Sequence, residues 1–244
     1  MTAAHRDGPG SADHHPRGQD VAQLGAPPPA ARRVFGARLP LAEQFAELLA
    51  RDAVVQGLIG PREISRLWDR HLLNSAVVTD LLPSGAHVVD VGSGAGLPGI
   101  AMAIRRPDLR VVLLEPMLRR TRFLTDVTQS LAISDTVRVV RGRAEEASVR
   151  DCLGPLEWVV ARAVAALDRL GMWCLPLLAP GGRLLAMKGA GAAAEVTQHR
   201  QALRRHGADE IALRELGGDL LAEPSRVVVV TRGVASRKVR GTGT

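Results

Sequence analysis

With 244 residues, of which 46% are apolar, the chain can bury the core of one large domain, with or without an appendage. No apolar run reaches the roughly 20 residues that a membrane helix needs, and residues 1–31 lack the basic-then-apolar order of a secretion signal. Over half of the net charge of +7 lies at the C-terminus, where residues 232–244 carry four basic and no acidic side chains. These properties exclude a membrane-spanning protein and are compatible with a polyanionic partner.

The composition of both chain ends predicts disorder. The hydrophobic pattern between them predicts a helical part followed by a larger domain. Residues 1–36 are rich in Gly, Pro, Asp and His and predict a disordered tail, and residues 233–244 predict a basic one. Residues 37–84 predict helices: Leu41, Phe45 and Leu49 share one helical face behind Pro40, and a second helix is expected from Pro61 to just before residue 83. Residues 85–232 then predict the main domain.

From residue 88 onward, short strands alternate with helices. Strands are expected at Val88–Val91, Arg110–Leu114, Val137–Arg141, Trp158–Ala161, Arg183–Lys188, Glu210–Glu215 and Arg226–Thr231, and helices at Pro98–Arg105, Leu118–Leu131, Glu145–Val149, Ala165–Leu178 and Ala192–His206. Strands separated by helices predict a parallel sheet covered on both faces. The last two strands have no helix between them and predict an antiparallel hairpin. We therefore expect a doubly wound α/β fold with a mostly parallel, seven-stranded, Rossmann-like sheet of the methyltransferase type.

The two cysteines, Cys152 and Cys174, form neither a CxxC pair nor a metal-like spacing with the seven histidines. We therefore expect reduced, at least half-buried thiols, no bound metal and a cytoplasmic protein. We also expect the protein to act as a monomer.

A glycine-rich turn over residues 92–99 joins the first strand to the next helix. Because Gly92 and Gly94 have no Cβ, a cofactor can approach the main chain closely there. Glu115 ends the second strand, 23 residues after Gly92, where its carboxylate can accept hydrogen bonds from both ribose hydroxyls of an adenosine cofactor. This combination occurs in sites for NAD and in sites for S-adenosylmethionine.

Three features favour S-adenosylmethionine. Asp90 directly before the turn is typical of methyltransferases, the G-x-G-x-G spacing departs from the dinucleotide fingerprint, and Ala144 and Glu145 follow the third strand, where an adenine ring would lie. An NAD-dependent oxidoreductase and a non-catalytic RNA-binding protein with the same fold remain as alternatives.

The methyl acceptor can be narrowed by the motifs that are missing. Residues 159–165 contain no Asn/Asp-Pro-Pro-aromatic motif for amino methylation, and neither cysteine is placed to attack a pyrimidine. N7 of guanine fits what remains, because its lone pair is nucleophilic without loss of a proton, and alignment in a dry site would supply the rate. Arg162, after the fourth strand, is the first candidate catalytic residue, as a donor to the cofactor carboxylate or the guanine edge; the alternative is a surface arginine. Arg143 is the second candidate, and Lys188 could contact RNA phosphate or simply end a strand.

The sequence resembles the bacterial small-subunit ribosomal RNA methyltransferase G family over roughly residues 41–231. The resemblance is carried by Arg70–Ser75, Val89–Ile100, Arg119–Leu124, Arg143–Glu146 and Ala161–Ala163. It implies transfer of a methyl group from S-adenosylmethionine to N7 of one guanine in 16S rRNA, as naked RNA or in the small ribosomal subunit. It also implies that Gly92 and Leu97 line the cofactor, that Ala144 and Glu145 meet its adenine, and that Arg162 contacts it. Residues 57–60 lack the Asn-Leu-Thr stretch that is usual in the family.

Overall fold

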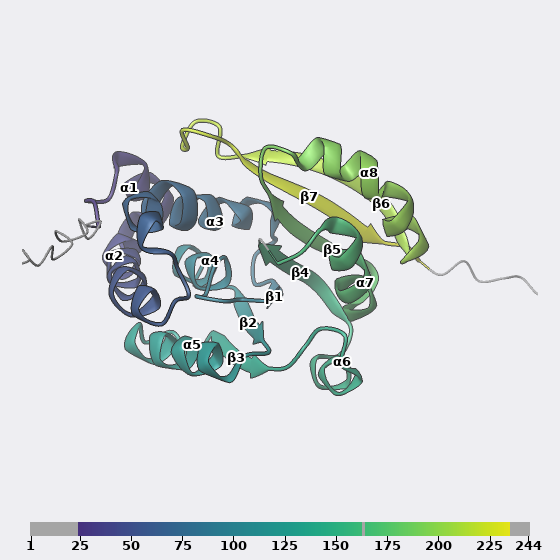
Figure 1. The fold of residues 1–244 in the computed structure, drawn as a ribbon, viewed down its shortest axis with the longest axis horizontal. Helices are drawn as coiled ribbons and strands as arrows, with labels where there is room; N and C mark the ends of the chain where they lie inside the picture. Colours follow the sequence, from purple (N-terminus) through teal and green to yellow (C-terminus); the bar gives the residue numbers. More distant parts are fainter. Residues whose placement is uncertain (1–23, 163, 235–244) are drawn as a thin grey trace, which may run out of the picture.

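Seven strands form one sheet in the order β3-β2-β1-β4-β5-β7-β6 (Figure 1). The computed structural model describes residues 24–162 and 164–234. The strands are β1 (His87–Val91), β2 (Arg110–Glu115), β3 (Val137–Arg141), β4 (Leu156–Arg162), β5 (Leu178–Lys188), β6 (Ala208–Leu216) and β7 (Ser225–Arg232). Strands β1 to β5 are parallel, and β7 runs antiparallel to both β5 and β6. The predicted doubly wound sheet with its C-terminal hairpin is confirmed.

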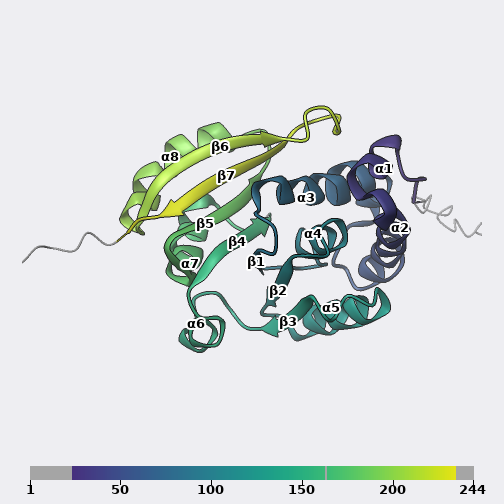
Figure 2. The same cartoon turned by 180° about the vertical axis from the view of Figure 1, so that it is seen from behind.

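Helices cover both faces of this sheet, as Figures 1 and 2 show from opposite sides. The α-helices are α1 (Pro29–Phe35), α2 (Leu39–Leu48), α3 (Asn74–Ala76), α4 (Gly99–Arg105), α5 (Leu118–Ser130), α6 (Ala147–Leu153), α7 (Leu167–Cys174) and α8 (Ala192–Arg205). One buried cluster joins the sheet to α1–α5 and includes Phe45, Ile100 and Leu124. A second cluster joins the opposite face to α6, α7 and α8 and includes Leu170 and Leu203. No helix of the described residues is long and apolar enough to cross a membrane.

The N-terminal part differs from the sequence prediction in two ways. The tail expected over residues 1–36 is wrong for its last part, because Pro29–Phe35 form α1 and bury Val34 and Phe35 against the core; residues 1–23 lie outside the described residues, as does most of the expected tail at 233–244. The second expected helix is a continuous segment of changing pitch. It consists of 3₁₀ turns at Pro61–Arg66, π turns at Leu67–Leu73, then α3, and 3₁₀ turns again at Val77–Leu81.

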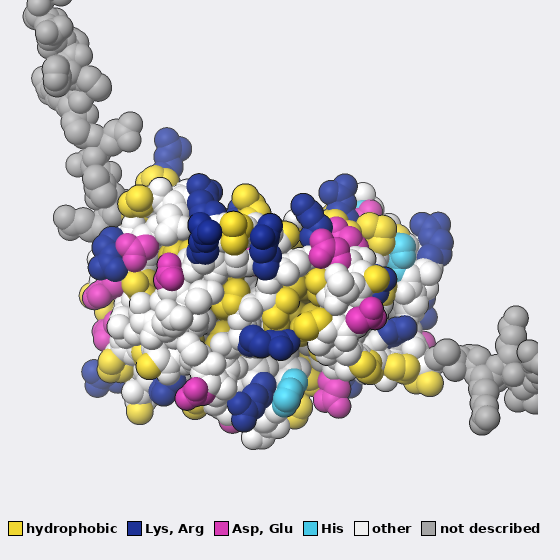
Figure 3. Space-filling view, turned by 90° about the horizontal axis from the view of Figure 1, so that it is seen from below, with side chains coloured by type: hydrophobic (Ala, Val, Ile, Leu, Met, Phe, Trp, Pro, Cys, Tyr) yellow, Lys and Arg dark blue, Asp and Glu magenta, His cyan; other side chains and the backbone are white. Residues whose placement is uncertain are grey.

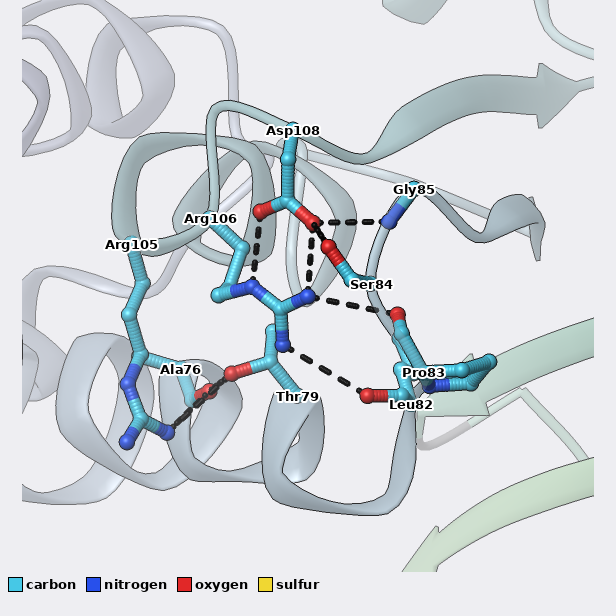
Figure 4. Close-up of polar contacts among 9 residues, drawn as sticks. All are labelled: Ala76, Thr79, Leu82, Pro83, Ser84, Gly85, Arg105, Arg106 and Asp108. Atoms are coloured by element: carbon cyan, nitrogen blue, oxygen red, sulfur yellow. Dashed lines mark hydrogen bonds and ion pairs between the residues drawn. The ribbon is translucent and has the colours of Figure 1, made fainter.

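Arginines at the end of α4 connect this N-terminal segment to the sheet domain (Figure 4). Arg105 donates to the Ala76 carbonyl oxygen (3.0 Å) and to Thr79 Oγ1 (3.1 Å). Arg106 donates to both carboxylate oxygens of Asp108 (2.7 and 2.6 Å) and to carbonyl oxygens of the loop that precedes β1. The N-terminal helices are therefore joined to α4 by polar contacts as well as by the shared core.

The cysteines differ from each other in their surroundings. Cys174 is buried, and this burial raises the pKa of its thiol to about 12, so the thiol stays neutral. Cys152 is exposed on α6, so the expectation that both thiols are at least half-buried is wrong for this residue. The described residues contain no group of His, Cys, Asp or Glu side chains that could hold a metal ion.

Candidate active site

The glycine turn lies where β1 ends and α4 begins, and its backbone is fixed by the neighbouring strand. The Gly92 and Ser93 amides both donate to the Leu114 carbonyl oxygen, at 2.8 and 3.3 Å. Gly92 has a φ of 72°, and a Cβ there would lie 2.8 Å from the side chain of Val164. Gly94 also has a positive φ, of 56°, and the nearest atom to its Cβ position is 3.8 Å away. The turn therefore leaves its backbone open on the side of Gly94, as the sequence predicts for close approach of a ligand.

Asp90, the last residue but one of β1, is fully buried beneath this turn. Its Oδ2 accepts a hydrogen bond from the Gly99 amide (3.0 Å), while Oδ1 has no partner among the described residues. Burial raises the pKa of Asp90 to about 7, although the Gly99 amide and the charge of Arg162 oppose the shift. The carboxyl group thus ties the end of β1 to Gly99, the first residue of α4.

Glu115 is held at the end of β2 by backbone amides. Its Oε2 accepts from the Gly94 amide (3.0 Å), its Oε1 accepts from the Met117 amide (3.1 Å), and Arg120 lies 3.8 Å away. An ionised carboxylate has about four acceptor positions, so two remain after these bonds. The side chain is fixed in direction and retains acceptor capacity, which suits the predicted pairing with ribose hydroxyls.

The end of β3 forms the neighbouring wall. Ala144 is buried, whereas Arg143 and Glu145 are exposed. Trp173, at the end of α7, lines the same wall; the sequence did not single it out.

Arg162, at the end of β4, donates its terminal N–H groups to the helical segment that precedes the sheet. Its Nη1 donates to Ser75 Oγ (2.8 Å) and to the His71 carbonyl oxygen (3.3 Å), and its Nη2 donates to His71 Nδ1 (2.6 Å) and to the Arg70 carbonyl oxygen (3.2 Å). Desolvation lowers the pKa of Arg162 to about 10, so the guanidinium keeps its charge at neutral pH. Arg162 is therefore anchored and is not a free surface arginine. Its Nε–H group donates to none of the described residues.

His71 connects Arg162 to a carboxylate from the same segment. Its Nε2 lies 2.7 Å from Glu63 Oε2, and Arg70 Nη1 lies 3.7 Å from Glu63 Oε1. Burial and the charge of Arg162 lower the pKa of His71, so the ring is neutral at pH 7. Since Nδ1 accepts from Arg162, the ring proton is on Nε2 and is donated to Glu63. Sequence reasoning gave no role to Glu63, although Arg70 and His71 belong to a stretch that carried the family resemblance.

The glycine turn, Glu115, Arg162 and the Glu63–His71 pair line one cavity of about 700 Å³, a size within the range of sites for small ligands. The structure brings all the predicted site residues to it. The cavity is lined by Gly92, Gly94, Leu97, Glu115, Arg143, Ala144, Glu145 and Arg162, and also by Leu58, Ile59, Gly60, Glu63, Arg70 and His71 from the helical segment. Lys188 is not on this wall. Its ammonium is held by Glu195 (2.8 Å) and the Ala165 carbonyl oxygen (2.7 Å), which corrects the suggestion that it contacts phosphate.

The residues fit S-adenosylmethionine. The acceptor positions of Glu115 and the open backbone at Gly94 would meet the ribose of such a ligand. In fold, this chain is similar to a solved structure of an S-adenosylmethionine-dependent methyltransferase, SibL, with a TM-score of 0.55, 18% sequence identity, and coverage of 84% of this chain and 70% of that chain. The fold is thus that of the methyltransferase class.

The family follows from the sequence comparisons. A family model described as rRNA small subunit methyltransferase G matches residues 38–222. Ribosomal RNA small subunit methyltransferase G of Mycolicibacterium paratuberculosis is 52% identical over 212 residues, covering 87% of this chain and 85% of that protein. The protein of the same name from Salinispora arenicola is 53% identical over 213 residues, with coverage of 84% and 88%. The chain belongs to the rRNA small subunit methyltransferase G family. This confirms the resemblance found in the sequence and removes the NAD-dependent oxidoreductase alternative.

Proposed function

We propose that this protein transfers a methyl group from S-adenosylmethionine to N7 of a guanine in 16S rRNA. The observation that carries the proposal is the cavity in which the glycine turn, Glu115 and Arg162 meet, in a chain of this family. When bound, S-adenosylmethionine supplies an electrophilic methyl group. The protein then has to hold the guanine and the methyl donor in line and exclude water.

Different residues of the cavity would contact different parts of the cofactor. Gly92, Gly94 and Leu97 would let the cofactor lie against the backbone of the turn, and Glu115 would accept from its ribose hydroxyls. Ala144 and Glu145 would flank the adenine. These roles follow the order of the strands from which the residues come, because β3, β2 and β1 are neighbours in the sheet.

The two arginines contribute positive charge. Arg162 would act on the cofactor carboxylate through its Nε–H and its charge, because its terminal N–H groups are already used. Arg143, exposed on the cavity wall, remains the second candidate catalytic residue. Neither arginine needs to remove a proton, because guanine N7 loses none when it is methylated.

Basic side chains near the cavity suit an RNA substrate. Arg70 and Arg143 line the cavity and are exposed, and Arg119 and Arg122 on α5 and Arg141 at the end of β3 are exposed on neighbouring elements. Seen from below, the molecular surface carries several basic side chains interspersed with acidic and apolar ones (Figure 3). Phosphate groups would be attracted there without sequence selectivity. We further propose that the protein acts as a cytoplasmic monomer on 16S rRNA or on the small ribosomal subunit.

The test is to map the modified nucleotide. Small subunits from cells that lack this gene are incubated with the purified protein and S-adenosylmethionine, and 7-methylguanosine is located by cleavage at the modified base. One new site in 16S rRNA is expected, and none when the cofactor is omitted. Binding of rRNA without any methyl transfer would refute the proposal and favour the non-catalytic RNA-binding alternative.

A further inference from the structure

The strand order indicates where in the cavity the acceptor base lies, if the proposed function is right. Adenine is placed by Ala144 after β3, ribose by Glu115 at the end of β2, and the remainder of the cofactor by Gly92 at the end of β1. The next strand in the sheet is β4, which ends at Arg162. The acceptor base is therefore expected at this end of the cavity, between β4 and the helical segment of residues 58–71, which lines it.

Glu63 is the acidic side chain that this segment contributes to the cavity wall. One imidazole ring separates it from Arg162, because His71 bonds Glu63 through Nε2 (2.7 Å) and Arg162 through Nδ1 (2.6 Å). The other acids of the cavity lie elsewhere: Glu115 is held by backbone amides at the glycine turn, and Glu145 follows β3.

Glu63 is ionised and has free acceptor positions. The hydrogen bond from His71 and the positive charge of Arg70 hold its pKa below the usual range. His71 uses one acceptor position of Oε2, and Arg70 is 3.7 Å from Oε1, beyond hydrogen-bond distance. With 32% of the side chain exposed, this carboxylate can accept further donors from the cavity side.

We propose that Glu63 selects guanine as the acceptor base by accepting hydrogen bonds from its N1–H and 2-amino groups. These donors lie on the edge of guanine that N7 methylation leaves untouched. Adenine presents a lone pair at N1 and no 2-amino group, so it would leave the carboxylate unpaired. A site built to pair with a donor discriminates strongly against a ligand that lacks it.

The test compares Glu63→Gln with wild-type protein on small subunits reconstituted with 16S rRNA that carries guanosine or inosine at the methylated position. Inosine lacks the 2-amino group but keeps N7 and N1–H. Wild-type kcat/KM is expected to fall about tenfold on inosine, within the discrimination usual for paired donor contacts. Glu63→Gln can still accept from His71. On guanosine, the variant is expected to lose at least about tenfold relative to wild type, because both contacts are affected. Replacing guanosine by inosine should then lower the kcat/KM of the variant almost no further, because its contact with the 2-amino group is already absent.

Two controls separate selection from other roles. Asp69→Asn removes the same charge from an exposed position of the same segment, away from the cavity, and should leave both rates unchanged. Affinity for S-adenosylhomocysteine should change less than twofold in Glu63→Gln. Independent, multiplicative losses from Glu63→Gln and from inosine would overturn the inference, and so would a tenfold loss of S-adenosylhomocysteine affinity. Either result leaves the proposed function standing if wild-type protein still methylates guanosine, whereas an inactive wild type would overturn both.

Discussion

Replacing Asp90 with asparagine should make the cofactor-free protein less sensitive to rising pH. Asp90 is fully buried, and its pKa is raised from 3.8 to about 7. Because the folded pKa lies above the unfolded one, the group contributes its full stability below about pH 4 and loses it as the pH rises through 7. The asparagine variant does not titrate and lacks this loss.

The size of the effect follows from the two pKa values. At about 1.4 kcal/mol per pKa unit, ionisation of buried Asp90 costs about 4 kcal/mol of unfolding free energy by pH 8. Roughly 2–3 kcal/mol of this cost develops between pH 5 and pH 8, because unfolded Asp is already mostly ionised at pH 5. An unpaired amide group in the variant adds a penalty of roughly 1–3 kcal/mol, but this penalty is the same at both pH values and cancels in the comparison.

The assay is urea unfolding of wild-type and Asp90→Asn protein at pH 5 and pH 8 without cofactor. The wild type should lose roughly 2–3 kcal/mol more than the variant between the two pH values. A parallel pH dependence of the two proteins would refute the inference that Asp90 is protonated at low pH in the fold. Bound S-adenosylhomocysteine should reduce the difference if a donor of the ligand reaches the free oxygen.

Three further predictions concern other contacts of the structure. Gly99→Ala should destabilise the protein by about 1–3 kcal/mol in urea unfolding, because the added methyl group overlaps the side chain of Leu113; Gly218→Ala, with no atom within 4 Å, is the matched control, and equal costs for both would contradict this packing. Arg162→Lys should lower kcat/KM for methyl transfer at least about tenfold, because one ammonium cannot replace the forked pairing with residues 70–75; wild-type kinetics would show that this pairing is dispensable. Arg106→Ala should lower the free energy of unfolding by about 1 kcal/mol and the Tm by about 2–4 °C in a calorimetric scan. An unchanged Tm would show that the hydrogen bonds of Arg106 to Asp108 and Pro83 do not stabilise the fold.

The sheet and the cofactor side of the site could be predicted because local sequence determines them. A buried strand that ends in a glycine turn, with Glu115 at the end of the next strand, places both at one edge of a parallel sheet whatever the rest of the chain does. Ala144 and Arg162 follow from the same rule. Once the strands were recognised, their ends located the cavity.

The acceptor side could not be predicted because it depends on how separate parts pack together. The sequence predicted a helix over residues 61–82, but not that Glu63 and His71 line the cavity at the end of β4. The composition of the first 36 residues predicted disorder, yet Val34 and Phe35 find partners in the core. In each case the deciding contact is with a residue distant in sequence, which local patterns do not report.

Helices α1–α5 share one buried core. A change that loosens the packing of the N-terminal helices therefore also disturbs the helix that begins at the cofactor turn. Removing α1 and α2 would expose Ile100 and its neighbours on α4, the helix that begins at the glycine turn. Missense changes at buried positions of residues 31–81 would therefore lower the amount of folded enzyme in the cell as well as its contact with RNA. Loss-of-function alleles of this gene should be scattered through those helices, and many should be rescued by lower growth temperature.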